Sequence, residues 1–298
     1  MMEYCLLVKL SGEINLKSHF VRIEFTKRLL ENIKQALKEK QISFNKIDRD
    51  GGRFFIYAEK NQAMKMLSFL NRIFGIHSIA LAQSFNESSL ESISENALAL
   101  AQEHLNKKDS FKIKTNRVGK HSFTSLDVSI HCADLINSRL GNKIDLTKPD
   151  KTIFIEIRQD KTFIYADEVE GFDGLPLAVS GRLLGFFSGS RQDLMAALMM
   201  MKRGCKIYFF LKGSEAKAGK ALNKLNESAL TDFKLIKASD LKGFIQEKNI
   251  KGMLISSNEV DKTMQAFNEL KHLKIPVYAP LLLVPGNLIN DFEKRFFS

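Results

Sequence analysis

The chain has 298 residues, a length that predicts two or three domains of modest size. Its composition, 44% hydrophobic and 27% charged, excludes a mainly disordered chain, and three cysteines exclude a small secreted domain built on disulfides. Lys and Arg number 45 against 34 Asp and Glu, so the net charge of +11 leaves nucleic acid, an anionic surface or an acidic protein as partners.

The first eighty residues predict a β-α-β-β-α-β unit. Five apolar residues, beginning at Val21, recur every four positions after Ser18 and predict one long amphipathic helix. The expected elements are a strand over 4–10, that helix from Ser18 through Leu37, strands over 42–47 and 53–58, a helix over 61–74 and a strand over 76–82. This order is that of a ferredoxin-like domain, to which we assign residues 1–82.

A second domain is expected over residues 83–170. Its predicted elements are a helix over 86–106, a strand from Phe111 through Thr115, a helix over 126–140 that Gly141 ends, and strands over 152–157 and 162–166. Alternation along the strand from Phe111 turns Lys112 and Lys114 outward together.

Residues 171–180, which begin Gly171-Phe172-Asp173-Gly174, are predicted to be a linker to a third domain over 181–298. Strands over 183–187, 207–211 and 253–255 alternate with helices over 193–203, 217–228, 240–248 and 259–273, and an extended segment over 275–280 follows. This alternation predicts a parallel α/β sheet with right-handed crossovers.

Charge follows these boundaries. Residues 1–80 carry a net charge of +6, residues 81–180 carry −3, and residues 181–298 carry +8. No run approaches 18 apolar residues and the start lacks a signal peptide, so we expect a cytoplasmic protein without a membrane span.

Two segments are candidates for anion binding. The turn Ser188-Gly189-Ser190 joins a strand to a helix, an arrangement that can hold phosphate, although most such turns are only tight connections and this one lacks a Walker ending. The basic stripe Lys112, Lys114, Arg117, Lys120 and His121 suits a phosphate backbone, and its alternative is a solvated strand face. Cys5, Cys132 and Cys205 have no metal-ligand spacing and are expected to be buried, and no metal site is predicted.

Several motifs, in order along about residues 4–211, resemble the tRNA 4-thiouridine synthase (tRNA sulfurtransferase) family. They are Gly12-Glu13-Ile14-Asn15-Leu16-Lys17, Arg72-Ile73-Phe74-Gly75-Ile76, Phe111 through Arg117, Lys120-His121-Ser122-Phe123, Glu156-Ile157-Arg158, Gly171 through Pro176, and Lys202-Arg203-Gly204-Cys205. The resemblance implies a ferredoxin-like domain, a THUMP domain and a Rossmann-like parallel α/β domain with a pyrophosphate loop. It also implies that the first two domains bind tRNA and that the third adenylates uridine with ATP.

The sequence departs from that family at the loop. Where the family has Ser-Gly-Gly-x-Asp-Ser, this chain has Ser188-Gly189-Ser190-Arg191-Gln192-Asp193. An acid at the last position is expected to repel phosphate, with Arg191 offsetting it in part. The third domain is also shorter than the family's, and no cysteine follows Cys205 to accept sulfur.

The sequence therefore predicts a tRNA-binding protein with a degenerate nucleotide loop, no catalytic residue and no cofactor. The acceptor end would bind Lys112, Lys114, Arg117, Lys120 and His121, with Lys17, Lys27 and Arg28 touching the same backbone. A separate modifying enzyme or sulfur donor is an expected partner, and a homodimer stays open. The alternative is an active ATP-dependent tRNA sulfurtransferase with a sulfur donor in trans, and a third hypothesis is a basic structural protein without RNA affinity.

Overall fold

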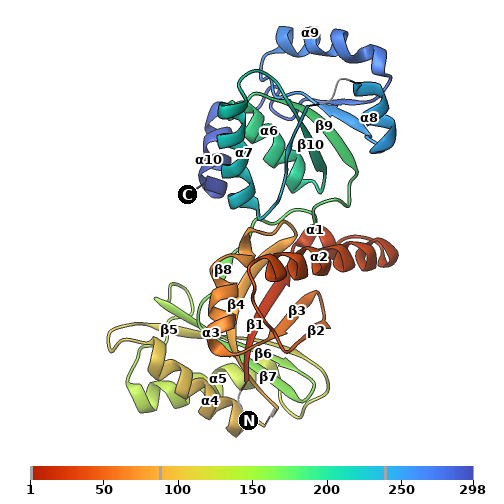
Figure 1. Cartoon of the computed structure of the whole chain (residues 1–298). Helices are drawn as coiled ribbons and strands as arrows, with labels where there is room; N and C mark the ends of the chain where they lie inside the picture. Colours follow the sequence, from red (N-terminus) through yellow and green to blue (C-terminus); the bar gives the residue numbers. More distant parts are fainter. Residues whose placement is uncertain (1–2, 87–88, 238–239, 298) are drawn as a thin grey trace. The chain divides into compact units, whose positions relative to one another are not determined.

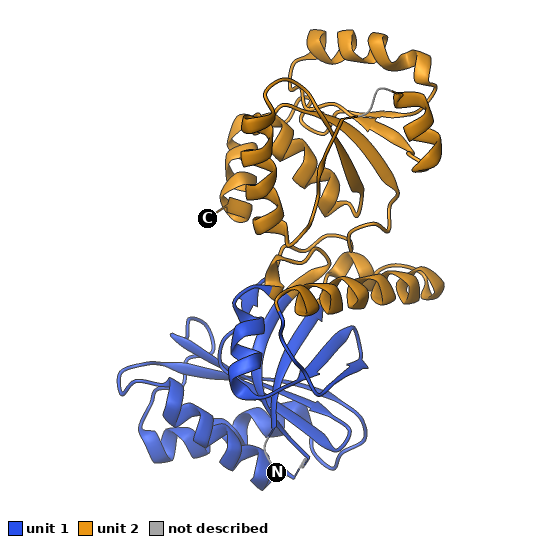
Figure 2. Ribbon diagram, viewed as in Figure 1, with its two compact units in different colours: residues 1–9, 41–69, 78–170 blue, residues 10–40, 70–77, 171–298 orange. Residues whose placement is uncertain are grey.

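The computed structural model describes residues 3–86, 89–237 and 240–297, so residues 87 and 88 of the helix predicted over 86–106 lie outside the described residues. The chain forms two compact units (Figure 2). Unit 1 comprises residues 1–9, 41–69 and 78–170, and unit 2 comprises residues 10–40, 70–77 and 171–298. None of the helices within the described residues has the length and apolar character that a membrane span requires.

Unit 1 is built on one eight-stranded sheet that the two predicted N-terminal domains share (Figure 1). Its strands run in the order β2-β3-β1-β4-β7-β6-β5, and β8 pairs with β4. The order β2-β3-β1-β4 is that of a ferredoxin-like sheet, which confirms the prediction. The strands are β1 Glu3–Leu10, β2 Lys46–Asp50, β3 Arg53–Tyr57, β4 Ile76–Phe85, β5 Phe111–Val118, β6 Lys151–Arg158, β7 Lys161–Tyr165 and β8 Val169–Glu170.

Helices α4 (Leu90–His104) and α5 (Ser125–Leu140) bury one face of β5, β6 and β7. Phe111 and Ile113 lie in this core, and Gly141 ends α5 with a left-handed backbone, as predicted. The opposite face of the sheet has its own core, in which Phe55 of β3 stacks on Phe163 of β7. The sheet must curl to bring β3 and β7 together, because two strands, β1 and β4, lie between them in its order.

The helical pattern predicted over 61–74 divides into two shorter helices. Helix α3 (Lys60–Leu67) ends early, and a 3₁₀ turn over Leu70–Arg72 follows. Phe69, Leu70, Ile73 and Phe74 are all buried, which a single helical stripe could not achieve because consecutive residues point in different directions around a helix. Unit 2 contains α1 (Gly12–Asn15) and α2 (His19–Glu39), which starts at the predicted Ser18 cap.

The rest of unit 2 is a five-stranded parallel sheet, as predicted, in the order β11-β10-β9-β12-β13. Helices α6, α7 and α10 cover one face, and α8 lies on the other (Figure 1). The strands are β9 Arg182–Phe187, β10 Lys206–Leu211, β11 Leu235–Ile236, β12 Gly252–Leu254 and β13 Val277–Tyr278. The helices are α6 Arg191–Lys202, α7 Glu215–Ala229, α8 Leu241–Glu247, α9 Val260–Leu270 with a 3₁₀ turn to Leu273, and α10 Gly286–Phe297.

Some elements differ from the sequence prediction. Helix α10 was not predicted, although it buries Ile289 and Phe296 in the core beside α6 and α7. The strand expected over 42–47 lies later, at Lys46–Asp50. The segment predicted to be a linker, 171–180, is packed, because Phe172 and Leu175 are buried within unit 2.

Candidate nucleic-acid interface and nucleotide loop

Two lysines of β5 lie together on the face of the sheet that α4 and α5 do not cover. Phe111 and Ile113 are buried beneath those helices, so alternation places Lys112 and Lys114 on the opposite face, as predicted. Lys114 is exposed, and its Nζ lies 5.9 Å from the centroid of the Phe154 ring on neighbouring β6. A phosphate could reach both ammonium groups from this face.

Arg117 and His121 lie elsewhere, so the five predicted cations do not share one face. Arg117 has the same parity along β5 as Ile113 and therefore points to the helix-covered side. Its Nη1 donates to Gly119 O at 3.2 Å and lies 3.1 Å from His121 Nδ1, while His121 Nε2 lies 2.8 Å from Gln159 O. The pattern assigns the ring proton to Nε2, because only a donor can bond a carbonyl. These contacts hold both side chains against the protein, whereas Lys120 is exposed.

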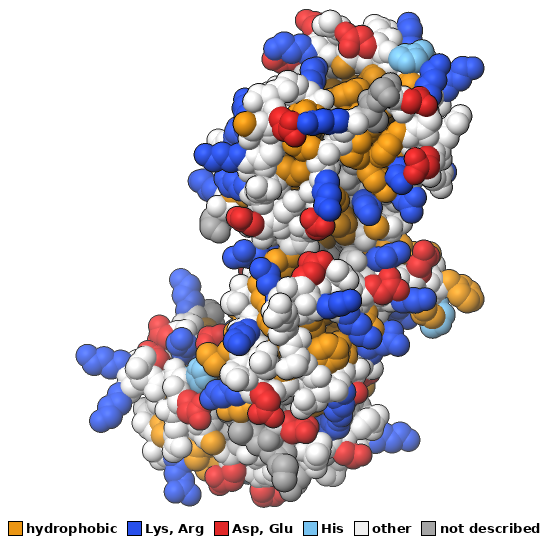
Figure 3. Space-filling view, viewed as in Figure 1, with side chains coloured by type: hydrophobic (Ala, Val, Ile, Leu, Met, Phe, Trp, Pro, Cys, Tyr) orange, Lys and Arg blue, Asp and Glu red, His pale blue; other side chains and the backbone are white. Residues whose placement is uncertain are grey.

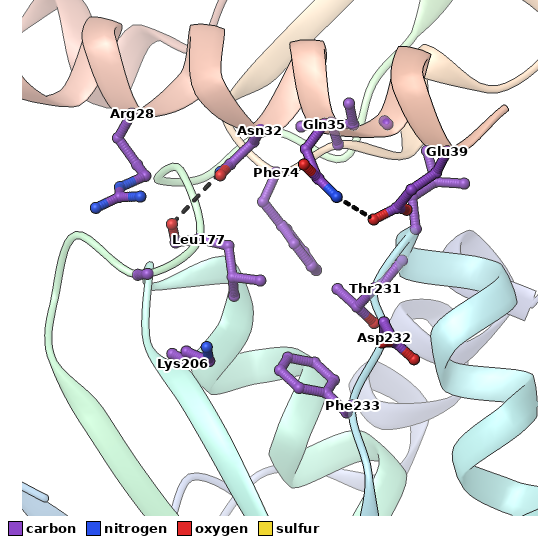
Figure 4. A pocket seen from close by; sticks show the side chains of 15 residues that line it. Arg28, Asn32, Gln35, Glu39, Phe74, Leu177, Lys206, Thr231, Asp232 and Phe233 are labelled. Carbon is purple, nitrogen blue, oxygen red and sulfur yellow. Dashed lines mark hydrogen bonds between the residues drawn. The ribbon is translucent and has the colours of Figure 1, made fainter. Parts of the chain in front are cut away.

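The cations predicted on the N-terminal helices belong to unit 2. Lys17, in the turn after α1, and Lys27, on α2, are exposed. Arg28 pairs with Glu31 at 3.0 Å, so a carboxylate already offsets its charge. Arg28 also lines a hollow of about 310 Å³ between α2, the segment at Leu177, the start of β10 and the loop after α7. Figure 4 shows Phe74, Leu177 and Phe233 facing this hollow.

A buried carboxylate, which the sequence does not predict, organises the face of the unit 1 sheet opposite α4 and α5. The Glu156 side chain is 3% exposed and accepts from Arg53 Nε at 2.7 Å and from Arg158 Nη2 at 3.0 Å. Lys9 Nζ lies 3.8 Å away, and Tyr165 OH donates to Glu156 at 3.3 Å. Its partners come from β1, β3, β6 and β7, so Glu156 links strands from both halves of the sheet order.

The predicted nucleotide loop lies between β9 and α6, and Asp193 closes it. One oxygen, Asp193 Oδ2, accepts from the backbone N–H of Ser188 at 2.9 Å, from the Ser188 hydroxyl at 2.7 Å and from the N–H of Ser190 at 3.1 Å. The other oxygen accepts from the Ser256 hydroxyl at 2.5 Å. Ser190 in turn accepts from the N–H of Asp193, which completes a capping box at the start of α6.

The Asp193 carboxylate is stable in its charged form. Burial alone would raise the pKa of this carboxyl, but the bonds from Ser256, Ser188 and Ser190 and their N–H groups outweigh it and lower the pKa below the ordinary value of 3.8. A phosphate in the loop would need the same N–H donors and would meet a fixed negative charge. The residues present therefore do not fit the phosphates of ATP.

Arg191 does not offset this charge, contrary to the sequence expectation. Its Nε donates to Glu293 at 2.7 Å and its Nη2 to Asn290 at 2.5 Å, both on α10. The side chain is thus directed toward α10 and paired there. A hollow of about 710 Å³ remains beside the loop at the carboxyl edge of β9 and β12, and it is lined by Ser188, Ser190, Asp193 and residues of α9.

The three cysteines are buried, as predicted. Burial raises the pKa of the Cys132 thiol to about 11 and also raises the pKa values of Cys5 and Cys205. Sulfur transfer through cysteine requires a thiolate, which a raised pKa disfavours. Among the described residues, no group of His, Cys, Asp and Glu has an arrangement that could hold a metal ion.

Two family models match consecutive parts of the chain. Residues 5–80 match the ThiI ferredoxin-like domain, and residues 87–167 match the THUMP domain. A probable tRNA sulfurtransferase of Methanobrevibacter smithii is 35% identical over 210 residues, which cover 69% of this chain and 53% of the relative. The chain belongs to the tRNA sulfurtransferase family. The tRNA sulfurtransferase of Blochmanniella pennsylvanica is 34% identical over 68% of this chain and 42% of its own length, so the chain spans about half the length of these relatives.

Two solved structures share the fold over nearly the whole chain. PH1313 from Pyrococcus horikoshii superposes with a TM-score of 0.85 at 27% identity, covering 98% of this chain and 99% of that one. A 4-thiouridine synthetase, solved as an RNA complex with bound ATP, has a TM-score of 0.79 at 20% identity and covers 99% of this chain and 85% of that one. Both likenesses include the C-terminal parallel α/β domain, so this chain shares the fold of that domain with the two solved structures.

Proposed function

We propose that this member of the family binds tRNA and does not adenylate it. The RNA-binding half of the proposal is supported by the two matched domains and by Lys112 and Lys114, which stand together on an open sheet face. Each lysine that contacts a phosphate releases condensed counterions, which favours binding. The acceptor end of tRNA is the proposed ligand of this face, and the protein would present the tRNA to a separate modifying enzyme or sulfur donor.

Asp193 is the residue that supports the proposed loss of adenylation. Its carboxylate uses the loop donors that a nucleotide phosphate would need, and its lowered pKa keeps it charged at neutral pH. No cofactor is proposed for the same reason. The alternative, an active ATP-dependent tRNA sulfurtransferase, requires the loop to release Asp193 before a phosphate can enter it.

Replacing Lys112 and Lys114 by alanine is expected to weaken tRNA binding roughly 10-fold near 150 mM salt. The dependence of log K on log salt concentration should flatten by about two, because about one counterion is released for each phosphate contact. Fluorescence polarisation with labelled tRNA across a salt series measures both quantities.

The control replaces Lys65 and Lys148 by alanine. Both lysines are exposed and lie in the same unit, so the control removes the same charge. It should leave the salt slope within about half a unit. Equal effects of the two pairs would reject the assigned face, and absence of tRNA binding by the unchanged protein would reject the function. Tight ATP binding with tRNA-dependent release of AMP would establish the alternative.

A further inference from the structure

Helix α7 carries a row of three lysines along one exposed face. Lys217, Lys220 and Lys224 are spaced by three and four residues, so they lie above one another on the helix surface. Ala218, Leu222 and Leu225 point the other way and are buried in the core that α7 shares with α6 and α10. The row is about 10 Å long, at 1.5 Å of rise per residue.

A hollow of about 550 Å³ lies beside this row. The described residues that line it are Gly189, Leu194, Lys217, Lys220, Ala221, Asn223, Lys224 and Glu227, and Glu227 is the one acid among them. The edge of the hollow is fixed because Gly189, with φ +76°, packs directly on α7. A β-carbon there would lie 2.7 Å from the Lys217 carbonyl oxygen. The same loop that Asp193 closes toward the sheet edge therefore borders an open, basic hollow on its α7 side.

These three lysines share the lining of the hollow with the carboxylate of Glu227. Within the part of the chain that the structure describes, none of their ammonium groups forms an ion pair, and the nearest acid of the helix start, Glu215, pairs with Lys237. Lys224 lies over the Phe297 ring at 4.3 Å, which holds its charge beside the hollow. Figure 3 shows Lys and Arg side chains gathered where Figure 1 draws α7 and α10.

We propose that the lysine row of α7 binds the phosphodiester backbone of RNA. The inference deepens the proposed function and rests on it, since tRNA is the polyanion that function supplies. A row of cations suits a repeating anion better than a single small one. Among the described residues that line the hollow, none has an aromatic side chain on which a base could stack, so the contact is to backbone and does not depend on sequence. The C-terminal domain would thus hold RNA although its nucleotide loop is closed.

The test compares three triple variants of the full chain. Replacing Lys217, Lys220 and Lys224 by alanine is expected to weaken tRNA binding roughly 10- to 100-fold near 150 mM salt and to flatten the salt slope by two to three. Replacing the same three by arginine should restore both. The control replaces Lys242, Lys251 and Lys271 by alanine. These lysines are exposed in the same domain but lie outside the hollow, so the control should change tRNA affinity less than threefold. Thermal melts check folding, which exposed lysines should alter little.

The outcomes separate this surface from the proposed function. If the Lys112 and Lys114 variant loses affinity but the α7 variant binds as the unchanged chain does, the α7 proposal is wrong and the function stands. If the unchanged chain binds no tRNA, both fail. Poly-glutamate, tested at the same charge concentration as tRNA, probes the other kind of partner. If it displaces tRNA, and if the α7 alanine variant loses poly-glutamate binding but keeps tRNA binding, the surface is a site for acidic protein and not for RNA.

Discussion

Replacing Glu156 by glutamine is expected to lower the free energy of unfolding by about 3 kcal/mol or more. The side chain is 3% exposed and faces Arg53, Arg158 and Lys9. Glutamine keeps the shape but removes the charge, so Arg53 loses its carboxylate partner, whereas Lys9 keeps Glu168 and Arg158 keeps Asp50. Removing one member of a buried ion pair is costly because the remaining charges stay desolvated without compensation.

The measurement is urea unfolding followed by far-ultraviolet circular dichroism, with the slope m compared between variants. Asp48→Asn is the matched control, since Asp48 also pairs with two lysines, Lys46 and Lys161, but is 45% exposed. Its loss should cost less than about 1 kcal/mol, as exposed pairs do. A Glu156→Gln variant as stable as Asp48→Asn would show that the network contributes no more than a surface ion pair.

The network around Glu156 could not be predicted from the sequence. Glu156 and Arg158 alternate with buried isoleucines on β6, a pattern typical of a solvated strand face. They are buried because the sheet curls and brings in Arg53, which is 103 residues away in the sequence. Local pattern predicts which residues share a face, but it does not predict what covers that face. For the first reason, the prediction that Lys112 and Lys114 share one face is confirmed, and their role in RNA binding stays a prediction.

The closure of the loop by Asp193 could be predicted in part from the sequence. A serine followed three residues later by an acid, Ser190 and Asp193, is a capping-box signature, and it predicts that the carboxylate turns back onto the backbone. The capping-box signature thus adds to the repulsion of phosphate that an acid at this position predicts. Two contacts could not be predicted: that of Asp193 with Ser256, and that of Arg191 with α10. Both depend on packing between elements that are distant in the sequence, and α10 itself was not expected.

Replacing Asp193 by alanine is expected to destabilise the protein by about 3 kcal/mol. About 1 kcal/mol comes from the lost helix cap, and the remainder comes from the partly buried donors of Ser188, Ser190 and Ser256, which lose their acceptor. Urea unfolding measures the change. Asp240→Ala removes a capping carboxylate from α8 that accepts only from Gly243 among the described contacts, and it should cost about 1 kcal/mol.

The contribution of Asp193 should also depend on pH in a defined direction. Its folded-state pKa is lower than the ordinary value of 3.8, so the folded state favours the charged form. The stabilisation is complete above the unfolded-state pKa and is lost as pH falls through the folded-state pKa. The stability difference between the unchanged chain and Asp193→Ala should therefore be constant near neutral pH and shrink below about pH 4. A difference that grows in acid would contradict the assigned charge state.

Replacing Asp193 by serine, the residue that the family's fingerprint has at this position, should open the loop to anions. The N–H groups of Ser188 and Ser190 then lose their carboxylate acceptor at the start of α6, where the helix dipole favours an anion. Pyrophosphate at ten times its dissociation constant should raise the stability of this variant by about 1.4 kcal/mol and leave the unchanged chain unaffected. Thermal melts in pyrophosphate, matched in ionic strength with chloride, measure this, and Asp240→Ser is the control because it uncaps α8 only. Equal stabilisation of the unchanged chain would mean that Asp193 does not block the loop, and the proposed loss of adenylation would fall with it.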